Sequence, residues 1–400
     1  MFNAAASWAA EETWLRRGRF AVLAALVDLA LYNLYQIIYS PTKWSDFAYF
    51  YSFAKAGLTY GDRRLYDPMV QLTSLHALFP SAEFYAVVNP PPFAWLLALI
   101  TIMPYSLALW MWTLSMVAAL AISSQLLAPN QGYPRTLFMS SWLGFLPAYL
   151  VFVSAPLAPL VMLSLALTWR FIRAERPVAA GLVLAIGLTK PTLVILVPFA
   201  LLAAGHRRVF ASWLVAAIVL IGASCAALGL DGIAAYARMS ATFASDAYSL
   251  RWSMVPFVGD GVPWLVAASL ISVATLWLAR RLRHDGCEAV IAVGVMGSFL
   301  VNHHTTPGDL MILLVPIWLV LGSRNSASSR TFVGGAWIAA WLGLIFPVWA
   351  IVAAAAIPVF LLARNLWSPS TAAFKSSEQA AFVPSLTPRS GDKLVTAQTS

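Results

Sequence analysis

The chain has 400 residues, of which 60% are hydrophobic and only 10% are charged. Soluble domains carry about 25% charged residues, so this composition excludes an ordinary soluble enzyme and predicts an all-α polytopic membrane protein. The formal net charge of +9 does not indicate nucleic acid as a partner, because membrane proteins retain Lys and Arg on one side of the bilayer. Membrane lipid is the expected surrounding.

The start of the chain resembles a signal peptide. Arg16, Arg17 and Arg19 precede the apolar run at 20–39, but no small-residue cleavage site follows that run. We therefore interpret residues 1–19 as a cytoplasmic segment and the run as an uncleaved first helix.

The apolar runs predict about twelve membrane crossings, within a range of about ten to thirteen. They belong to one transmembrane domain at 20–363, and the Ser-, Thr- and Pro-rich tail at 364–400 is expected to be disordered and cytoplasmic. The predicted crossings are 20–39, 105–127, 137–153, 155–170, 178–189, 192–203, 209–230, 262–279, 286–302, 309–321, 331–346 and 347–363.

The distribution of positive charge fixes the orientation of these crossings. With the N-terminus inside, 18 of the 25 Lys and Arg residues face the cytoplasm. Two large outer loops, 40–88 and 231–261, follow from this topology. The orientation requires that 89–104 does not cross; Pro90, Pro91 and Pro92 cannot lie inside a helix, so we expect a short re-entrant or outer-leaflet helix there.

A broken helix pair is predicted around Lys190, at 178–189 and 192–203. Each segment of about twelve residues spans about 18 Å, less than the bilayer core of about 30 Å. Pro191 removes a backbone donor at the junction. Such a break is tolerated where it lines a polar cavity, so Lys190 either binds a phosphate there or extends its ammonium to the headgroups.

Asp46 is an acidic candidate in the first outer loop. It is either the N-cap of a short interfacial helix or a general base that removes a proton from a hydroxyl. Asp67 precedes Pro68, which favours a role in a turn.

His303 and His304 are adjacent, so they would point apart on a helix. The Thr305-Thr306-Pro307 sequence that follows predicts a backbone turn that would bring them together at the outer side. No further His or Cys lies at ligand spacing, so a zinc site is not expected.

These motifs together resemble the GT-C superfamily of integral-membrane glycosyltransferases, and most closely glycosyltransferase family 87, whose members use polyprenyl-phosphate-mannose. The resemblance lies in the order of five short motifs. They are Asp46-Phe47 with Phe50-Tyr51, then Leu65-Tyr66-Asp67, then Asn89-Pro90-Pro91-Pro92-Phe93, then Gly187 with Lys190-Pro191, and last His303-His304.

The resemblance implies a GT-C-type fold with short interfacial helices in the first outer loop, and it assigns the catalytic base to Asp46. It implies transfer of a hexose, with mannose indicated, from a polyprenyl-phosphate donor to a lipid-linked or cell-envelope glycan, by one displacement with inversion. Lys190, His303 and His304 are expected to bind the donor phosphate, without a cofactor or metal. Substrate contacts are expected from the first outer loop: Tyr49, Tyr51, Tyr66 and Asp67.

The expected location is the bacterial inner membrane, with the active site on the periplasmic side. A transporter or flippase for lipid-linked sugars is the main alternative. It would favour charges at the bilayer midplane and repeated halves, neither of which the sequence shows. A polymerase or ligase for lipid-linked saccharides is a third reading, but those would favour Arg-rich outer loops.

Overall fold

The computed structural model describes residues 46–128, 142, 144–244, 250–323 and 327–367. These segments contain helices and connections but no strand, which confirms the all-helical prediction. The chain divides into two compact units, Met1–Leu361 and Leu362–Ser400, and the description below concerns the first.

The α-helices are α2 (Asp46–Tyr60), α3 (Pro68–His76), α4 (Pro91–Ala98), α5 (Tyr105–Leu127), α7 (Leu150–Val153), α8 (Ala158–Arg173), α9 (Pro177–Leu184), α10 (Val197–Ala203), α11 (Arg207–Phe243), α13 (Val255–Val258), α14 (Val262–Arg281), α15 (Cys287–Leu300), α16 (Leu314–Ser323), α17 (Ala327–Leu342) and α18 (Pro347–Trp367). The 3-10 helices are η1 (Asp62–Arg64), η2 (Leu146–Tyr149), η3 (Ala185–Thr189), η4 (Pro191–Leu193), η5 (Leu282–His284) and η6 (Pro307–Leu313).

Four of the described helices are long and apolar enough to cross a membrane: α5, α11, α14 and α18. Other predicted crossings coincide with shorter apolar helices, such as Cys287–Leu300. The crossing predicted at 20–39 lies outside the described residues, as does part of the one at 137–153 and most of the tail. The membrane character of the chain is therefore supported, and the count of about twelve crossings stays a prediction.

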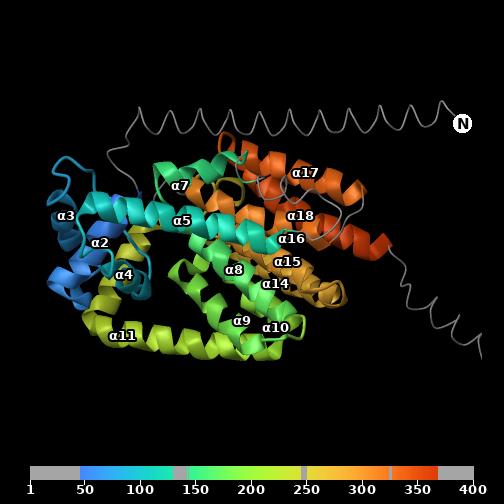
Figure 1. Cartoon of the computed structure of the whole chain (residues 1–400), viewed down its shortest axis with the longest axis horizontal. Helices are drawn as coiled ribbons and strands as arrows, with labels where there is room; N and C mark the ends of the chain where they lie inside the picture. Colours follow the sequence, from blue (N-terminus) through green and yellow to red (C-terminus); the bar gives the residue numbers. More distant parts are fainter. Residues whose placement is uncertain (1–45, 129–141, 143, 245–249, 324–326, 368–400) are drawn as a thin grey trace, which may run out of the picture. The chain divides into compact units, whose positions relative to one another are not determined.

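Helix α15 lies at the centre of the helical bundle. Every residue from Cys287 to Phe299 is buried, as expected for a helix that is apolar on all sides. It packs against α10, α14 and α16, while α8 packs on α5 and α9 (Figure 1). This central helix leads directly into residues 301–306 and η6, the segments that carry several candidate site residues.

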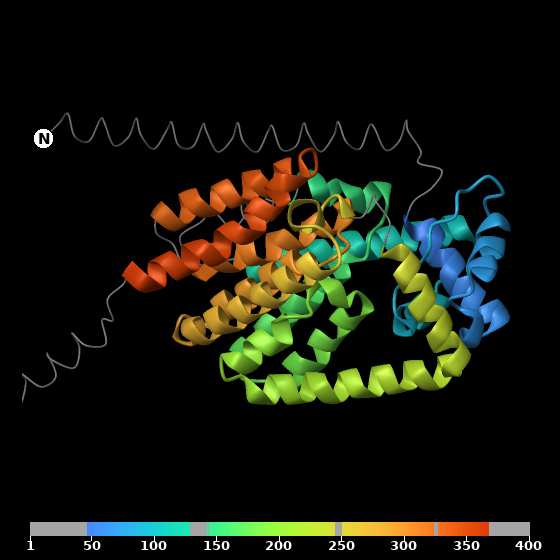
Figure 2. The same ribbon diagram turned by 180° about the vertical axis from the view of Figure 1, so that it is seen from behind.

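The segment before α5 forms a separate cluster of short helices. Helix α2 packs against α3, α4 and η1, and this cluster lies beside the far end of α11 (Figure 2). Helix α4 starts at Pro91, where the lack of an N–H costs nothing, and its eight residues span only about 12 Å. The prediction of a short helix within 89–104 is confirmed.

Helix α11 bends at Gly229 and continues well beyond its predicted crossing. Gly229 has a φ of 63°, which a glycine adopts without steric cost. After the bend, Gly232 lies against η1: a β-carbon there would be 3.1 Å from the backbone oxygen of Arg63. The predicted outer segment at 231–261 therefore begins as helix up to Phe243, and α11 packs against η1 and α4.

The broken helix pair around Lys190 is present as predicted. Helix α9 tightens into η3, Lys190 adopts an extended φ of −143° with ψ 74°, and η4 follows at Pro191. Residue Lys190 therefore stands at a break between two 3-10 turns, where its side chain leaves the helical ladder.

Candidate active site

Asp46 stands in the first turn of α2, where the chain docks onto the turn between α7 and α8. The backbone N–H of Phe47 donates a hydrogen bond of 3.2 Å to the carbonyl of Ser154. The hydroxyl of Ser154 donates a 3.2 Å hydrogen bond to the carbonyl of Leu150, and it lies close enough to the Asp46 carboxylate to lower its pKa. Asp46 is partly exposed to solvent, but protein atoms surround most of its carboxylate.

Two charged groups from distant parts of the chain act on Asp46. Burial raises the pKa of Asp46 to about 6; the Lys190 ammonium opposes this rise, Asp309 adds to it, and the Ser154 hydrogen bond opposes it. A general base works best when its pKa is near the operating pH. The environment thus converts an ordinary carboxyl group into one suited to accept a proton near neutrality.

Lys190 forms an ion pair with Asp309. Its ammonium lies 2.5 Å from Asp309 Oδ1, and the lysine side chain is 21% exposed whereas the Asp309 side chain is 0% exposed. The ammonium is therefore held inside the protein, so the alternative in which Lys190 only extends to the headgroups is disfavoured. If Lys190 binds a phosphate, as the sequence predicts, it does so with an ammonium that is already paired with Asp309.

Asp309 was missed by the sequence reasoning. Its Oδ2 accepts hydrogen bonds from the backbone N–H of Thr306, at 2.9 Å, and from the Thr306 hydroxyl, at 3.1 Å. This is the reciprocal capping pattern of a Thr with an acid three residues later, which the sequence displays at the start of η6. Because capping alone explains an acid at the start of an apolar run, nothing in the sequence singled out Asp309 as a site residue.

The turn at 154–156 contacts both the start of α2 and the segment that bears Asp309. Ala155 has a φ of 51°, unusual for a residue with a β-carbon, and its carbonyl accepts a 2.8 Å hydrogen bond from the indole N–H of Trp112. Pro156 packs directly on Gly308, the neighbour of Asp309.

Asn89 connects two of the motifs. The hydroxyl of Tyr66 donates a 2.6 Å hydrogen bond to the Asn89 carbonyl, and the Asn89 amide donates one of 3.1 Å to the carbonyl of Thr189. Thr189 directly precedes Lys190. The first-loop motif, the proline motif and the lysine motif are thus joined by hydrogen bonds.

Tyr51 and Tyr66, which were expected as substrate contacts, are buried in the structure. Tyr51 is 3% exposed and donates a 2.7 Å hydrogen bond to the Met103 carbonyl. Tyr66 is 1% exposed and packs between the rings of Phe53 and Tyr236. Both rings hold the first-loop helices together, and neither presents a face to a substrate.

Asp67 also has a structural explanation. It caps α3 by accepting a 3.0 Å hydrogen bond from the backbone N–H of Met69, and it pairs with Arg64 at 3.0 Å. This confirms the reading of Asp67 as a turn residue before Pro68 and makes a substrate contact unnecessary to explain it.

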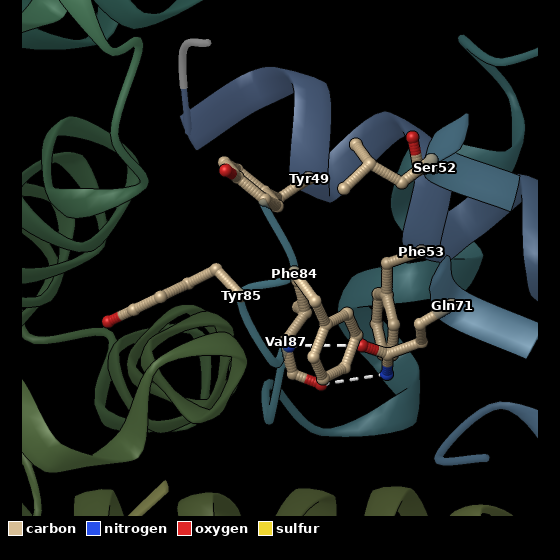
Figure 3. A pocket seen from close by; sticks show the side chains of 8 residues that line it. Tyr49, Ser52, Phe53, Gln71, Phe84, Tyr85 and Val87 are labelled. Atoms are coloured by element: carbon tan, nitrogen blue, oxygen red, sulfur yellow. Dashed lines mark hydrogen bonds between the residues drawn. The ribbon is translucent and has the colours of Figure 1, made fainter. Parts of the chain in front are cut away.

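Tyr49 remains a candidate substrate contact, one helical turn after Asp46. It borders a shallow hollow whose walls are mainly aromatic and aliphatic. Figure 3 shows Tyr49 and Tyr85 on one side of this hollow and Gln71 bonded to Val87 on the other. The Tyr49 hydroxyl donates a hydrogen bond of 3.2 Å to the carbonyl of Glu83, and its ring meets Tyr85 edge-on. The lining residues are Tyr49, Ser52, Phe53, Gln71, Leu75, Phe84, Tyr85 and Val87.

His303 and His304 lie together on the non-helical connection between α15 and η6, as the predicted turn requires. Their rings are joined by a 2.9 Å contact between Nδ1 of His303 and Nε2 of His304. The charged partner of His303 is Asp260, at 2.9 Å, rather than Lys190. The hydrogen bond from His303 lowers the pKa of Asp260. The structure thus links this pair to the segment before α14, an association the sequence did not indicate.

Within the described segments, no group of three or more His, Cys, Asp and Glu side chains is arranged to hold a metal ion. The charged residues that act on Asp46 are Lys190 and Asp309.

Comparison with known proteins identifies the chain's family. Residues 88–302 match the family model described as Glycosyltransferase family 87. No curated protein and no solved structure matches the chain. The matched region contains Asn89 and Lys190, and Asp46 and Asp309 flank it on either side. Because this match covers more than half of the sequence, the chain belongs to glycosyltransferase family 87 and is a membrane glycosyltransferase.

Proposed function

We propose that the protein transfers a hexose, with mannose as the first candidate, from a polyprenyl-phosphate donor to a lipid-linked or cell-envelope glycan. The observation that carries this proposal is the grouping of Asp46, Lys190 and Asp309. A carboxylate poised near neutral pH beside a fixed ammonium supplies the two functions that the reaction needs: a base for the acceptor and a cation for the leaving phosphate.

Asp46 is the general base in this proposal. It takes the proton of an acceptor hydroxyl, whose oxygen attacks the anomeric carbon of the donor sugar. The bond from that carbon to the phosphate oxygen breaks at the same time, and the electron pair leaves with the phosphate. One displacement from the opposite face inverts the anomeric centre.

Lys190 stabilises the charge that develops on the departing phosphate. An ammonium carries three donors, and Asp309 occupies one of them. The Lys190 side chain is 21% exposed, so a phosphate can reach the accessible part of it. We propose His303 and His304 as further phosphate contacts, because the connection that bears them continues directly into Asp309.

Tyr49 is the proposed contact for a sugar ring. Its ring lies one turn beyond Asp46 and forms part of the hollow beside α2. An aromatic face next to a base suits an acceptor sugar, which has apolar and polar sides.

The site is proposed to face the periplasm in a bacterial inner membrane. The support is the bias of 18 of the 25 Lys and Arg residues to the opposite side of the predicted topology. A donor with its polyprenyl chain in the outer leaflet would present its phosphate at that interface. Membership of a glycosyltransferase family disfavours a transporter or flippase.

The direct test is transfer by the purified protein. Polyprenyl-phosphate-linked mannose, glucose and galactose, and the corresponding nucleotide sugars, are offered separately with a lipid-linked glycan acceptor, and the product is analysed for anomeric configuration. We expect transfer from one donor with inversion. Transfer only from nucleotide sugars, or a product with retained configuration, would contradict the proposal.

A further inference from the structure

We propose that Asp309 is a positioning residue of the active site: its carboxylate holds the Lys190 ammonium back from Asp46, leaving Asp46 as base and Lys190 in place for the donor phosphate. This inference rests on the proposed function, because it assumes that Asp46 accepts a proton. It adds a residue to the reaction that the sequence motifs did not include.

Asp309 has the properties of a fixed anchor. Its side chain is 0% exposed, and both oxygens are engaged: Oδ2 by the N–H and hydroxyl of Thr306, and Oδ1 by Lys190. A buried carboxylate is retained only when it is paired and hydrogen-bonded. The capping contacts fix the orientation of Asp309, so the oxygen that faces Lys190 cannot turn away without breaking them.

Lys190 is the partner with the more flexible side chain. It stands at the break between η3 and η4, and a lysine side chain reaches its ammonium through a flexible four-carbon stem. In the described structure the ammonium lies within the influence of two carboxylates, Asp309 and Asp46. The surrounding structure therefore determines whether the ammonium pairs with Asp309 or with Asp46.

The titratable groups that act on Asp46, or on which it acts, come from three elements. Lys190 belongs to the junction of η3 with η4, Asp309 to η6, and Tyr49 to the same helix as Asp46. If Asp309 loses its charge, Asp46 becomes the remaining carboxylate among them. The ammonium then shifts toward Asp46, lowers its basicity and is less available to a phosphate.

The substitution Asp309→Asn tests this inference. Asparagine keeps the shape and can still accept the Thr306 hydrogen bonds, so the fold should persist. The pH dependence of kcat/KM for the acceptor reports the base in the free enzyme. We expect its acidic limb to move down by about one pH unit, since a nearby opposite charge shifts a carboxyl pKa by about 1–3 units. The donor KM should rise in the same variant.

The substitution Lys190→Met provides the opposite shift. Removing the ammonium takes away the main influence that opposes the raised pKa of Asp46, so the acidic limb should move to higher pH. If Asp309→Asn alone fails to fold, the double variant with Lys190→Met removes the pair without leaving an unpaired charge. The acidic limb of the double variant should lie at a higher pH than that of the unmodified enzyme. Lys190 lowers the pKa of Asp46 more than Asp309 raises it.

Glu288→Gln is the matched control. Glu288 is also a buried acid with a cationic partner, Arg173 at 3.3 Å, but it lies at the opposite end of α15 from the connection to η6. This substitution should lower stability without moving the acidic limb. An Asp309→Asn enzyme that behaves in the same way, with reduced stability and an unmoved limb, would show that Asp309 is only structural and overturn the inference.

A measurement without turnover separates this inference from the proposed function. The carboxyl stretching band of Asp46, assigned by its loss in Asp46→Asn, is followed by infrared spectroscopy against pH. Its midpoint should lie near 6 in the unmodified protein and lower in Asp309→Asn. If the purified enzyme used a different donor, the proposed substrate would be wrong while this shift remained; an unshifted band would contradict the role of Asp309 itself.

Discussion

Gly308 lies so close to Pro156 that a β-carbon on Gly308 would stand 2.8 Å from the β-carbon of the proline. Gly308 precedes Asp309, and Pro156 closes the turn that starts at Ser154. This contact therefore joins the segment that bears Asp309 to the turn that binds the start of α2.

Gly308→Ala should reduce transfer by at least about tenfold, because small displacements of reacting groups are costly. The added methyl must push Pro156 away, since overpacked contacts are relieved by backbone movement. Transfer rate and thermal midpoint are measured together with those of Gly334→Ala. Gly334 lies in α17 with open space around it, so that variant should keep the rate and gain up to about 1 kcal/mol. A Gly308→Ala enzyme of normal rate would show that this contact does not set the site.

Lys190→Ala should weaken donor binding as well as turnover, because a contact made in the ground state is lost. Lys190→Arg should not restore either, since a planar guanidinium cannot take the place of a compact ammonium against the fixed oxygen of Asp309. The measurement is the donor KM together with competition by a non-transferable polyprenyl phosphate. Unchanged apparent affinity in Lys190→Ala would exclude a contact between this lysine and the donor.

The activity of the unmodified enzyme should rise with pH through about 6. The deprotonated form of Asp46 is the active base, and burial raises its pKa from 3.8 to about 6. The same shift has a stability counterpart. The folded state binds this proton more tightly than the unfolded state, so the stabilising contribution is complete below about pH 4 and is lost as pH rises through 6. An acidic limb near pH 4 would indicate an unperturbed carboxyl group as the base.

Cysteine labelling tests the orientation of the first loop. Glu83 is exposed in the segment predicted to face outward, and Arg283 is exposed in one predicted to face the cytoplasm. After the native Cys225 and Cys287 are replaced, Glu83→Cys should react with an impermeant thiol reagent in intact cells, and Arg283→Cys only after lysis. The reverse pattern would invert the topology and move the site to the cytoplasmic side.

The sequence predicted those features that depend on local backbone chemistry. Proline positions identified the short helix α4 and the break at Lys190, and the Thr-Thr-Pro run identified the turn that joins the histidines. Each of these follows from the missing N–H and restricted φ of proline, so no knowledge of tertiary contacts was required.

The misses depend on tertiary contacts. Tyr51 and Tyr66 resemble interfacial aromatics in the sequence, but packing among the first-loop helices buries them. The pairing of Asp309 with Lys190 joins residues 119 positions apart, and no periodicity reports such a distance. The extension of α11 to Phe243 was obscured by charged residues after Gly229, which are compatible with an exposed helix as well as with a loop.

The central claim, that Asp46 is the general base, is tested most directly by the transfer rate of Asp46→Asn. Asparagine keeps the shape, accepts the same hydrogen bonds and serves a helix start almost equally well, but it cannot take a proton. The variant should fold and bind donor normally and transfer sugar at least about 100-fold more slowly, as loss of general-base assistance predicts. A well-folded Asp46→Asn enzyme with near-normal transfer would contradict the account and remove Asp46 from the mechanism.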